Sequence, residues 1–154
     1  MGKKKVKNYD PWIYKEEALL EIPEGVYGFI YEIECKSTGE KYIGKKAFHS
    51  YHTSFERVLN EKTNRMNKVR KVTATESNWK DYFGSSVEIK TLVKEKGTED
   101  FTRRILRFCN SKKALTYYEL AEQCIHDVLN PENKYINQNI LGKFFSSDLF
   151  EVQK

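Results

Sequence analysis

The alternation of apolar and polar residues is clearest in the first third of the chain. Apolar side chains recur at every second position through Phe29, Tyr31 and Ile33, which is the period of a β-strand with one buried face. The residues Ser37-Thr38-Gly39 interrupt this pattern, and it resumes with interspersed charges around Tyr42. A short turn that contains glycine between two such segments predicts a β-hairpin.

A third strand and a long helix are predicted in the second half of the chain. Residues Phe101 to Phe108 alternate again and indicate a strand. Ser111 is a suitable N-cap for a helix that we expect to reach about Leu129 and to be closed by Pro131. Apolar residues on a four-three spacing predict its buried stripe: Ala114, Tyr118, Ala121, Ile125 and Val128.

Two glutamates on this long helix are predicted to differ in environment. Glu119 lies beside the apolar stripe, one turn after Leu115, whereas Glu122 is expected to be exposed to solvent.

Shorter helices are predicted elsewhere. The pattern favours helices from Tyr14 to Glu21, from Glu76 to Phe83 and from Glu88 to Lys96. The segment from His49 to Leu59 is weakly helical, because its apolar residues are four positions apart.

Composition indicates one folded domain. The 154 residues are 39% hydrophobic and 14% aromatic, which argues against disorder although 32% are charged. No apolar run has the length of a membrane span and no signal peptide follows the basic start, so we expect no membrane contact and a cytoplasmic location. Cys35, Cys109 and Cys124 fit reduced thiols, and no zinc-type spacing of cysteines or histidines is present.

The charge balance predicts an anionic partner. The net charge is +5, with a pI near 9.0. Residues 1–9 have the composition of a solvated basic arm. Between residues 57 and 71, Glu61 is the single acidic residue, and few large apolar residues are present, so we expect an exposed loop or loose helix there. The positive residues of this segment are Arg57, Lys62, Arg65, Lys68, Arg70 and Lys71.

The predicted hairpin resembles the signature of the GIY-YIG nuclease family. Its two tripeptides occur here as Phe29-Ile30-Tyr31 and Tyr42-Ile43-Gly44, at the family's spacing. The stretches "YIGKK", "WKDYFGSS" and "YYE" are similar to phage-encoded, Seg-like homing endonucleases. The resemblance covers about Gly25 to Ile140.

This resemblance implies an α/β (α+β) fold with a small three-stranded antiparallel sheet flanked by helices. We expect one nuclease domain over residues 25–141, preceded by a basic arm and short helix over 1–24 and followed by a tail over 142–154. For a phage-encoded protein, the expected location is the cytoplasm of the host cell.

The resemblance also implies an activity, the metal-dependent hydrolysis of DNA phosphodiester bonds. One divalent cation, Mg²⁺ or Mn²⁺, would be held by Glu119. Tyr31 and Tyr42 would bring their hydroxyls to one phosphate and orient the attacking water. Asn139 is expected to brace the site, with Asn137 as the alternative.

The family's arginine, expected about ten residues after the second tyrosine, is absent from that position in this chain. That position is His52, and the nearest arginine is Arg57. We therefore expect Lys46 and Arg57 jointly to stabilise phosphate charge, with Lys45 beside Lys46 as an alternative source. Further DNA contacts are expected from a basic and aromatic set: Lys45, His52, Arg65, Lys68, Arg70, Lys71, Trp79 and Lys80. Trp79 has an alternative role, in which it packs against the sheet and does not contact DNA.

Two other functions fit the sequence less well. An inactive DNA-binding protein on the same scaffold would be expected to lose at least one of Tyr31, Tyr42 and Glu119, and all three are present. A different nuclease superfamily pairs two acids with a lysine, as in Asp81 and Glu88-Ile89-Lys90, but that pattern requires strands where a helix is predicted. We expect the partner to be DNA, bound by a monomer or a homodimer.

Overall fold

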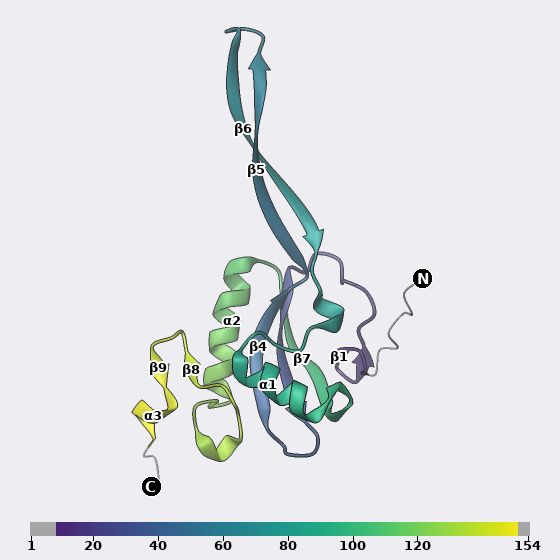
Figure 1. Cartoon of the computed structure of the whole chain (residues 1–154), viewed down its shortest axis with the longest axis vertical. Coiled ribbons are helices and arrows are strands. Elements are labelled where there is room, and N and C mark those ends of the chain that lie inside the picture. Colours follow the sequence, from purple (N-terminus) through teal and green to yellow (C-terminus); the bar gives the residue numbers. More distant parts are fainter. Residues whose placement is uncertain (1–8, 151–154) are drawn as a thin grey trace.

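A mixed five-stranded sheet forms the centre of the protein in a computed structural model that describes residues 9–150 (Figure 1). Its order is β2-β1-β7-β3-β4. The strands are β1 (Ile13–Tyr14), β2 (Glu17–Ala18), β3 (Gly28–Cys35), β4 (Lys41–Ala47) and β7 (Phe101–Cys109).

The predicted hairpin and third strand are confirmed. Strands β3 and β4 are antiparallel with Tyr31 opposite Gly44, and β7 pairs antiparallel with β3 on the other side. Gly39 closes the turn with a φ of 76°, a conformation that glycine adopts without strain. The sheet is larger than the predicted three strands, because β1 adds to β7 in parallel and β2 follows β1.

The helix predicted from Tyr14 to Glu21 is wrong. The chain forms the two short strands β1 and β2 instead, joined through Lys15 (φ 46°) and Glu16 (φ 70°). Two consecutive positive φ values give the tight turn that matches the twist of a hairpin. Residues 13–18 are therefore part of the sheet, while the predicted basic arm lies outside the described residues except for Tyr9.

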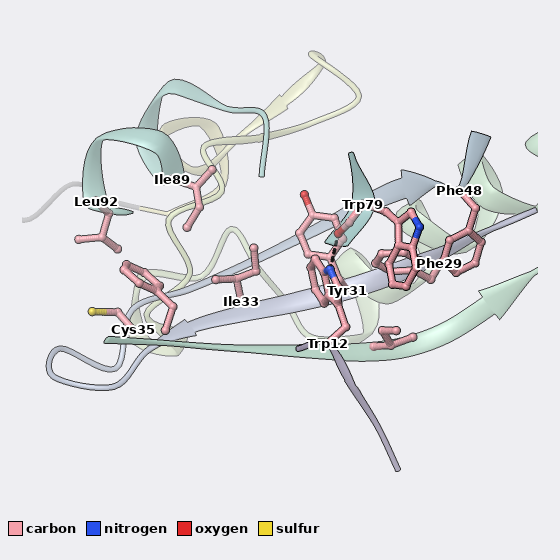
Figure 2. Close-up of a cluster of buried hydrophobic side chains, with 11 residues drawn as sticks. Trp12, Phe29, Tyr31, Ile33, Cys35, Phe48, Trp79, Ile89 and Leu92 are labelled. Carbon is pink, nitrogen blue, oxygen red and sulfur yellow. Dashed lines mark hydrogen bonds between the residues drawn. The ribbon is translucent and has the colours of Figure 1, made fainter. Parts of the chain in front are cut away.

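One face of the sheet is covered by α1 (Val87–Lys96) and by the single turn η1 (Trp79–Asp81), and a further single turn, η2 (Thr98–Asp100), follows α1. Figure 2 shows the aromatic core beneath them, in which Trp12, Tyr31 and Trp79 are buried. The indole Nε1 of Trp12 donates to the carbonyl oxygen of Trp79 at 2.6 Å. The predicted helix from Glu88 to Lys96 is confirmed, whereas the helix predicted from Glu76 to Phe83 is reduced to η1.

The opposite face is covered by α2 (Lys112–Ile125), which packs against β3 and β4. The Ser111 cap is confirmed, since its hydroxyl accepts a hydrogen bond from the Ala114 amide at 3.1 Å. The helix ends earlier than predicted, and Pro131 begins the turn η3 (Pro131–Asn133).

The predicted stripe on α2 is partly wrong. Ile125 is 71% exposed, and the buried positions of the helix are Leu115, Glu122 and Gln123. The helix therefore faces the sheet with a stripe one residue away from the predicted one, and two of its buried positions are polar. Beyond η3 follow β8 (Asn139–Ile140), β9 (Phe144–Phe145) and α3 (Ser146–Leu149).

The largest departure from the predictions is a two-stranded ribbon, formed by β5 (His49–Asn60) and β6 (Arg65–Glu76). It projects far from the rest of the molecule (Figure 1). The weak helix from His49 and the basic loop or loose helix between residues 57 and 71 are both wrong as conformations, although the predicted exposure is confirmed. The strands meet through a four-residue turn, in which the Asn64 amide donates to the Asn60 carbonyl at 2.8 Å.

The ribbon escaped prediction for a physical reason. Apolar and polar residues alternate along a half-buried strand because one of its faces is buried. Both faces of this ribbon are exposed to solvent, so its sequence does not alternate in this way. Its β-branched residues, such as Val69, Val72 and Thr73, were the available signal for strands.

Among the described residues, no helix is long and apolar enough to cross a membrane.

Candidate active site

Strand β4 lies at an edge of the sheet, and side chains from two other segments complete its hydrogen bonding. The Asn137 amide accepts from the Ile43 N–H at 3.1 Å and donates to the Ile43 carbonyl at 2.8 Å. Gln123 of α2 donates to the same carbonyl at 3.2 Å. Asn137 therefore acts as a substitute strand at this edge and fixes the middle of the YIG tripeptide.

A cleft of about 230 Å³ opens beside this edge. It brings together three of the residues predicted from the sequence, Tyr42, Glu119 and Asn139. Asn139 differs from Asn137 in being exposed, and its side chain accepts from the Gly142 amide at 3.0 Å. The rest of the lining includes Ser86, Glu88, Gln123 and Asn137.

A larger cavity of about 670 Å³ shares Glu88 and Asn137 with this cleft. The other charged residues in its lining are Glu40 and Glu95. Neither Tyr42 nor Glu119 lines this larger cavity, so the smaller cleft is the better candidate site for DNA chemistry.

Tyr31 lies behind Tyr42 in a cluster of three tyrosines. Tyr31 is fully buried, and its ring centroid is 6.3 Å from that of Tyr42 and 5.8 Å from that of Tyr82. A Cβ on Gly44 would lie 2.5 Å from the Tyr31 hydroxyl oxygen, so any side chain there would displace the tyrosine. The glycine of the second tripeptide thus makes room for the tyrosine of the first.

The hydroxyls of Tyr31 and Tyr42 remain protonated at neutral pH. Burial raises the pKa of Tyr31 well above its usual value, and the neighbouring Tyr82 and Tyr42 raise it further. Burial also raises the pKa of Tyr42, partly offset by a hydrogen bond with Ser86. Such hydroxyls can donate or relay a proton, but the tyrosinate form is disfavoured at both positions.

Glu119 carries its carboxylate into the cleft from α2. Its side chain is 24% exposed, and burial raises its pKa, while Lys45 opposes this shift. The Lys45 ammonium lies 3.8 Å from the carboxylate and also donates to the Thr116 hydroxyl at 3.2 Å.

The surroundings of Glu119 fit a hydrated divalent cation. Within residues 9–150, no three histidine, cysteine, aspartate or glutamate side chains converge on one point, so a closed protein cage for an ion is absent there. Mg²⁺ retains several waters and binds through one or two carboxylates together with substrate phosphates. One partly desolvated carboxylate in an open polar cleft meets that requirement.

Lys46 projects on the opposite face of β4 from Lys45. Its ammonium donates to the Asn78 side chain at 2.8 Å and lies 4.1 Å from the centroid of the Tyr82 ring. Burial lowers the pKa of Lys46. Tyr82 thus links Lys46 to Tyr31. Tyr82 belongs to the stretch "WKDYFGSS", which carries part of the family resemblance.

Several predicted site residues lie away from the cleft. Arg57, His52 and the other basic residues of the segment are exposed on the ribbon, and none of them lines the cleft. Lys80 is exposed on η1. The other predicted basic residues on the ribbon, besides Arg57 and His52, are Arg65, Lys68, Arg70 and Lys71.

Two expectations need correction. Trp79 is fully buried, packs edge-on against Phe48 and donates from Nε1 to the Glu76 carboxylate at 3.0 Å. It has no free surface for a base, so packing explains it and the predicted DNA contact does not hold. Glu122 is buried rather than exposed and pairs with Arg107 at 3.5 Å and His126 at 3.4 Å.

A protein-family comparison agrees with the fold and with the two tripeptides. The model described as "Putative endonuclease segE, GIY-YIG domain" matches residues 12–140. The chain therefore belongs to the GIY-YIG endonuclease family, in its Seg-like branch. The match begins at Trp12, ahead of the predicted domain start, and so includes β1 and β2. Neither curated proteins nor solved structures gave a match.

Proposed function

We propose that this protein is a DNA endonuclease that hydrolyses phosphodiester bonds with water as the nucleophile and one divalent cation bound by Glu119. The observation that carries the proposal is the cleft at the edge of β4, which Tyr42 and Glu119 line together. A proton-bearing hydroxyl and a partly desolvated carboxylate thereby face one space large enough for a phosphate group.

Each residue has a role that follows from its surroundings. Tyr42 borders the cleft and orients the attacking water through its hydroxyl. Tyr31 is a positioning residue, since its buried hydroxyl bonds with Tyr82 and contacts Tyr42 through the ring. Asn137 holds the β4 backbone in place, and Asn139 lines the cleft beside Glu119.

Phosphate charge must be balanced for the reaction to proceed. When bound, Mg²⁺ or Mn²⁺ at Glu119 would supply most of this compensation. Lys45 lies next to Glu119, and Lys46 lies beside the tyrosine cluster, so both are close to the tripeptides. Arg57 lies on the ribbon outside the cleft, and we assign it to DNA binding rather than to the chemical step.

The decisive test is the variant Glu119→Gln in a plasmid-nicking assay with Mg²⁺ and with chelator. An amide keeps the shape but loses the charge that attracts the cation, so metal-dependent nicking should be abolished. DNA binding should survive, because one negative charge leaves the phosphate site.

The matched control is Glu132→Gln, an exposed glutamate at η3 that does not line the cleft. It should nick at the parental rate. Glu122 is unsuitable as a control because its carboxylate is buried and pairs with Arg107. Parental nicking by Glu119→Gln at saturating Mg²⁺ would refute the cation assignment, and a parent protein that binds DNA without nicking it would favour the inactive DNA-binding alternative.

A further inference from the structure

In the part of the chain that the structure describes, the ribbon of β5 and β6 contacts the body near its base, where the Tyr27 and Tyr51 rings stack at 5.9 Å, and projects away from the body beyond that point (Figure 1). Each strand has 12 residues, which gives a length of about 40 Å at about 3.3 Å per residue. Between Ser50 and Glu76, all side chains except that of Asn60 are exposed. An isolated two-stranded ribbon is at best marginally stable in water. A ribbon this long that projects alone (Figure 1) points to an occupant that covers it in function.

The two sides of the ribbon differ in charge. Because cross-strand partners share a side, Arg57 and its partner Lys68 lie on the same side as Phe55 and its partner Arg70. Like charges directly opposite each other destabilise a strand pair. Among residues 9–150, no carboxylate forms an ion pair with these three cations. We call this side the Arg57 side.

The other side carries fewer cations, namely Lys71 and, next to the turn, Arg65. Glu56 and Lys71 form an ion pair there at 3.3 Å, and closer to the body that side carries His52 opposite Thr73 and Ser50 opposite Thr75. The remaining acids of the segment are Glu61 in the turn and Glu76 at the base. Within the described part of the chain, three cations without an ion-pair partner thus lie on the Arg57 side, whereas the other side has one, Arg65.

Apolar groups lie among these cations. Phe55 is 57% exposed with the Lys68 ammonium 4.6 Å from its ring centroid, and Leu59 lies opposite Met66 nearer the tip. A surface that combines cations with exposed apolar groups complements base edges flanked by phosphates, since apolar side chains contact thymine methyl groups and arginines bind guanine.

We propose that the ribbon inserts into the major groove of DNA with its Arg57 side facing the base edges. The choice of DNA as occupant rests on the proposed function. The major groove is about 12 Å wide and admits a two-stranded ribbon, whereas the minor groove is only about 6 Å wide. A length of about 40 Å corresponds to about one turn of duplex, so the ribbon contacts DNA well beyond the cleaved bond.

Chemical protection distinguishes the two grooves. The full chain is bound at saturation to a mixed-sequence duplex of about five turns with chelator present, and the DNA is treated with dimethyl sulfate. Guanine N7 reports the major groove and adenine N3 the minor groove. We expect guanine N7 to be protected several-fold more than adenine N3.

Two triple variants with equal charge change provide the comparison. Arg57→Gln, Lys68→Gln and Arg70→Gln together should lose the guanine protection even at saturating protein. The control Lys90→Gln, Lys94→Gln and Lys96→Gln removes three exposed charges from α1, outside the ribbon, and should keep it. Both variants should melt like the parent, because all six residues are exposed.

Three results would overturn the insertion: protection of adenine N3 in place of guanine N7, equal loss of protection in both variants, or a protein that dimerises through the ribbon without protecting DNA. A parallel nicking assay separates this proposal from the catalytic one. A parent that nicks DNA without guanine protection overturns the ribbon proposal alone, and a parent that protects guanine without nicking overturns only the catalytic one.

Discussion

The central sheet and the ribbon are built from similar residues that serve opposite purposes. In β3, seven of the eight residues are buried, whereas β6 has none. Tyr31 in the sheet is completely enclosed, while Tyr51 in the ribbon is 50% exposed. The sheet is held by the burial of apolar surface on both faces, and the ribbon by backbone pairing and its turn. Stability and surface contacts are therefore separated between two parts of the chain, and substitutions should affect one without the other.

The strongest test of that separation compares two aromatic residues. Trp79→Ala removes a fully buried side chain and should destabilise the fold by about 3–5 kcal/mol. Phe55→Ala in the ribbon should change stability by less than about 0.5 kcal/mol. Urea denaturation measures both. Comparable losses in the two variants would mean that the ribbon packs against the body in solution.

Within the sheet, loss of the hydroxyl should have different effects at Tyr42 and Tyr31, because Tyr42 borders the cleft and Tyr31 is buried behind it. Tyr42→Phe removes a hydroxyl that borders the cleft and should lower the nicking rate by about 10²–10⁴-fold with little change in stability. Tyr31→Phe removes a buried hydroxyl bonded to Tyr82, so it should cost about 1 kcal/mol of stability as well as activity.

Single-turnover nicking and thermal melting together measure these effects. Parental nicking rates in both variants would show that the two tyrosines serve packing alone.

The success of the sequence predictions follows the same division. The β3–β4 hairpin, β7 and α1 were predictable because each buries one or both faces and leaves a periodic trace. Tyr42, Glu119 and Asn139 were selected through the family resemblance and line one cleft.

The contributions of Asn137 and Tyr82 depend on packing between segments far apart in the chain. Asn137 was considered only as an alternative to Asn139, since its bond to Ile43 spans 94 positions. The ribbon left no periodic trace because neither of its faces is buried.

The ribbon should account for much of the salt dependence of DNA binding. Replacing Arg65, Lys68, Arg70 and Lys71 with glutamine should reduce the slope of log K against log salt by about 3–4, since each phosphate contact contributes about 0.9. The melting temperature should not change, because all four are exposed. Fluorescence anisotropy from about 50 to 200 mM salt measures the slope.

A matched control removes four exposed lysines from the body: Lys15, Lys90, Lys94 and Lys96. It should leave most of the slope intact. An unchanged slope in the ribbon variant would exclude the ribbon from the DNA surface.

The smallest predicted effect concerns the stability contributed by Glu119. Burial raises the pKa of Glu119 in the folded protein, so the folded state holds this proton more tightly than the unfolded state. The stability gained from that proton is present below the unfolded pKa, about 4.3, and is lost as the pH rises through the folded pKa. At pH 7 without metal, the ionised carboxylate therefore destabilises the fold, with Lys45 compensating only in part.

Glu119→Gln should thus melt above the parent at neutral pH in chelator, because the variant buries no charge at this position. The difference should vanish below about pH 4, where the parent carboxyl is protonated. Mg²⁺ should raise the melting temperature of the parent but not that of the variant, because a ligand stabilises only the protein that binds it. A variant that melts below the parent at pH 7 would mean that the pair with Lys45 outweighs the burial of the charge. Lys45 alone would then compensate the Glu119 charge, and the carboxylate would need no cation. The cleft would in that case no longer differ from the ribbon in holding a charge that destabilises the fold.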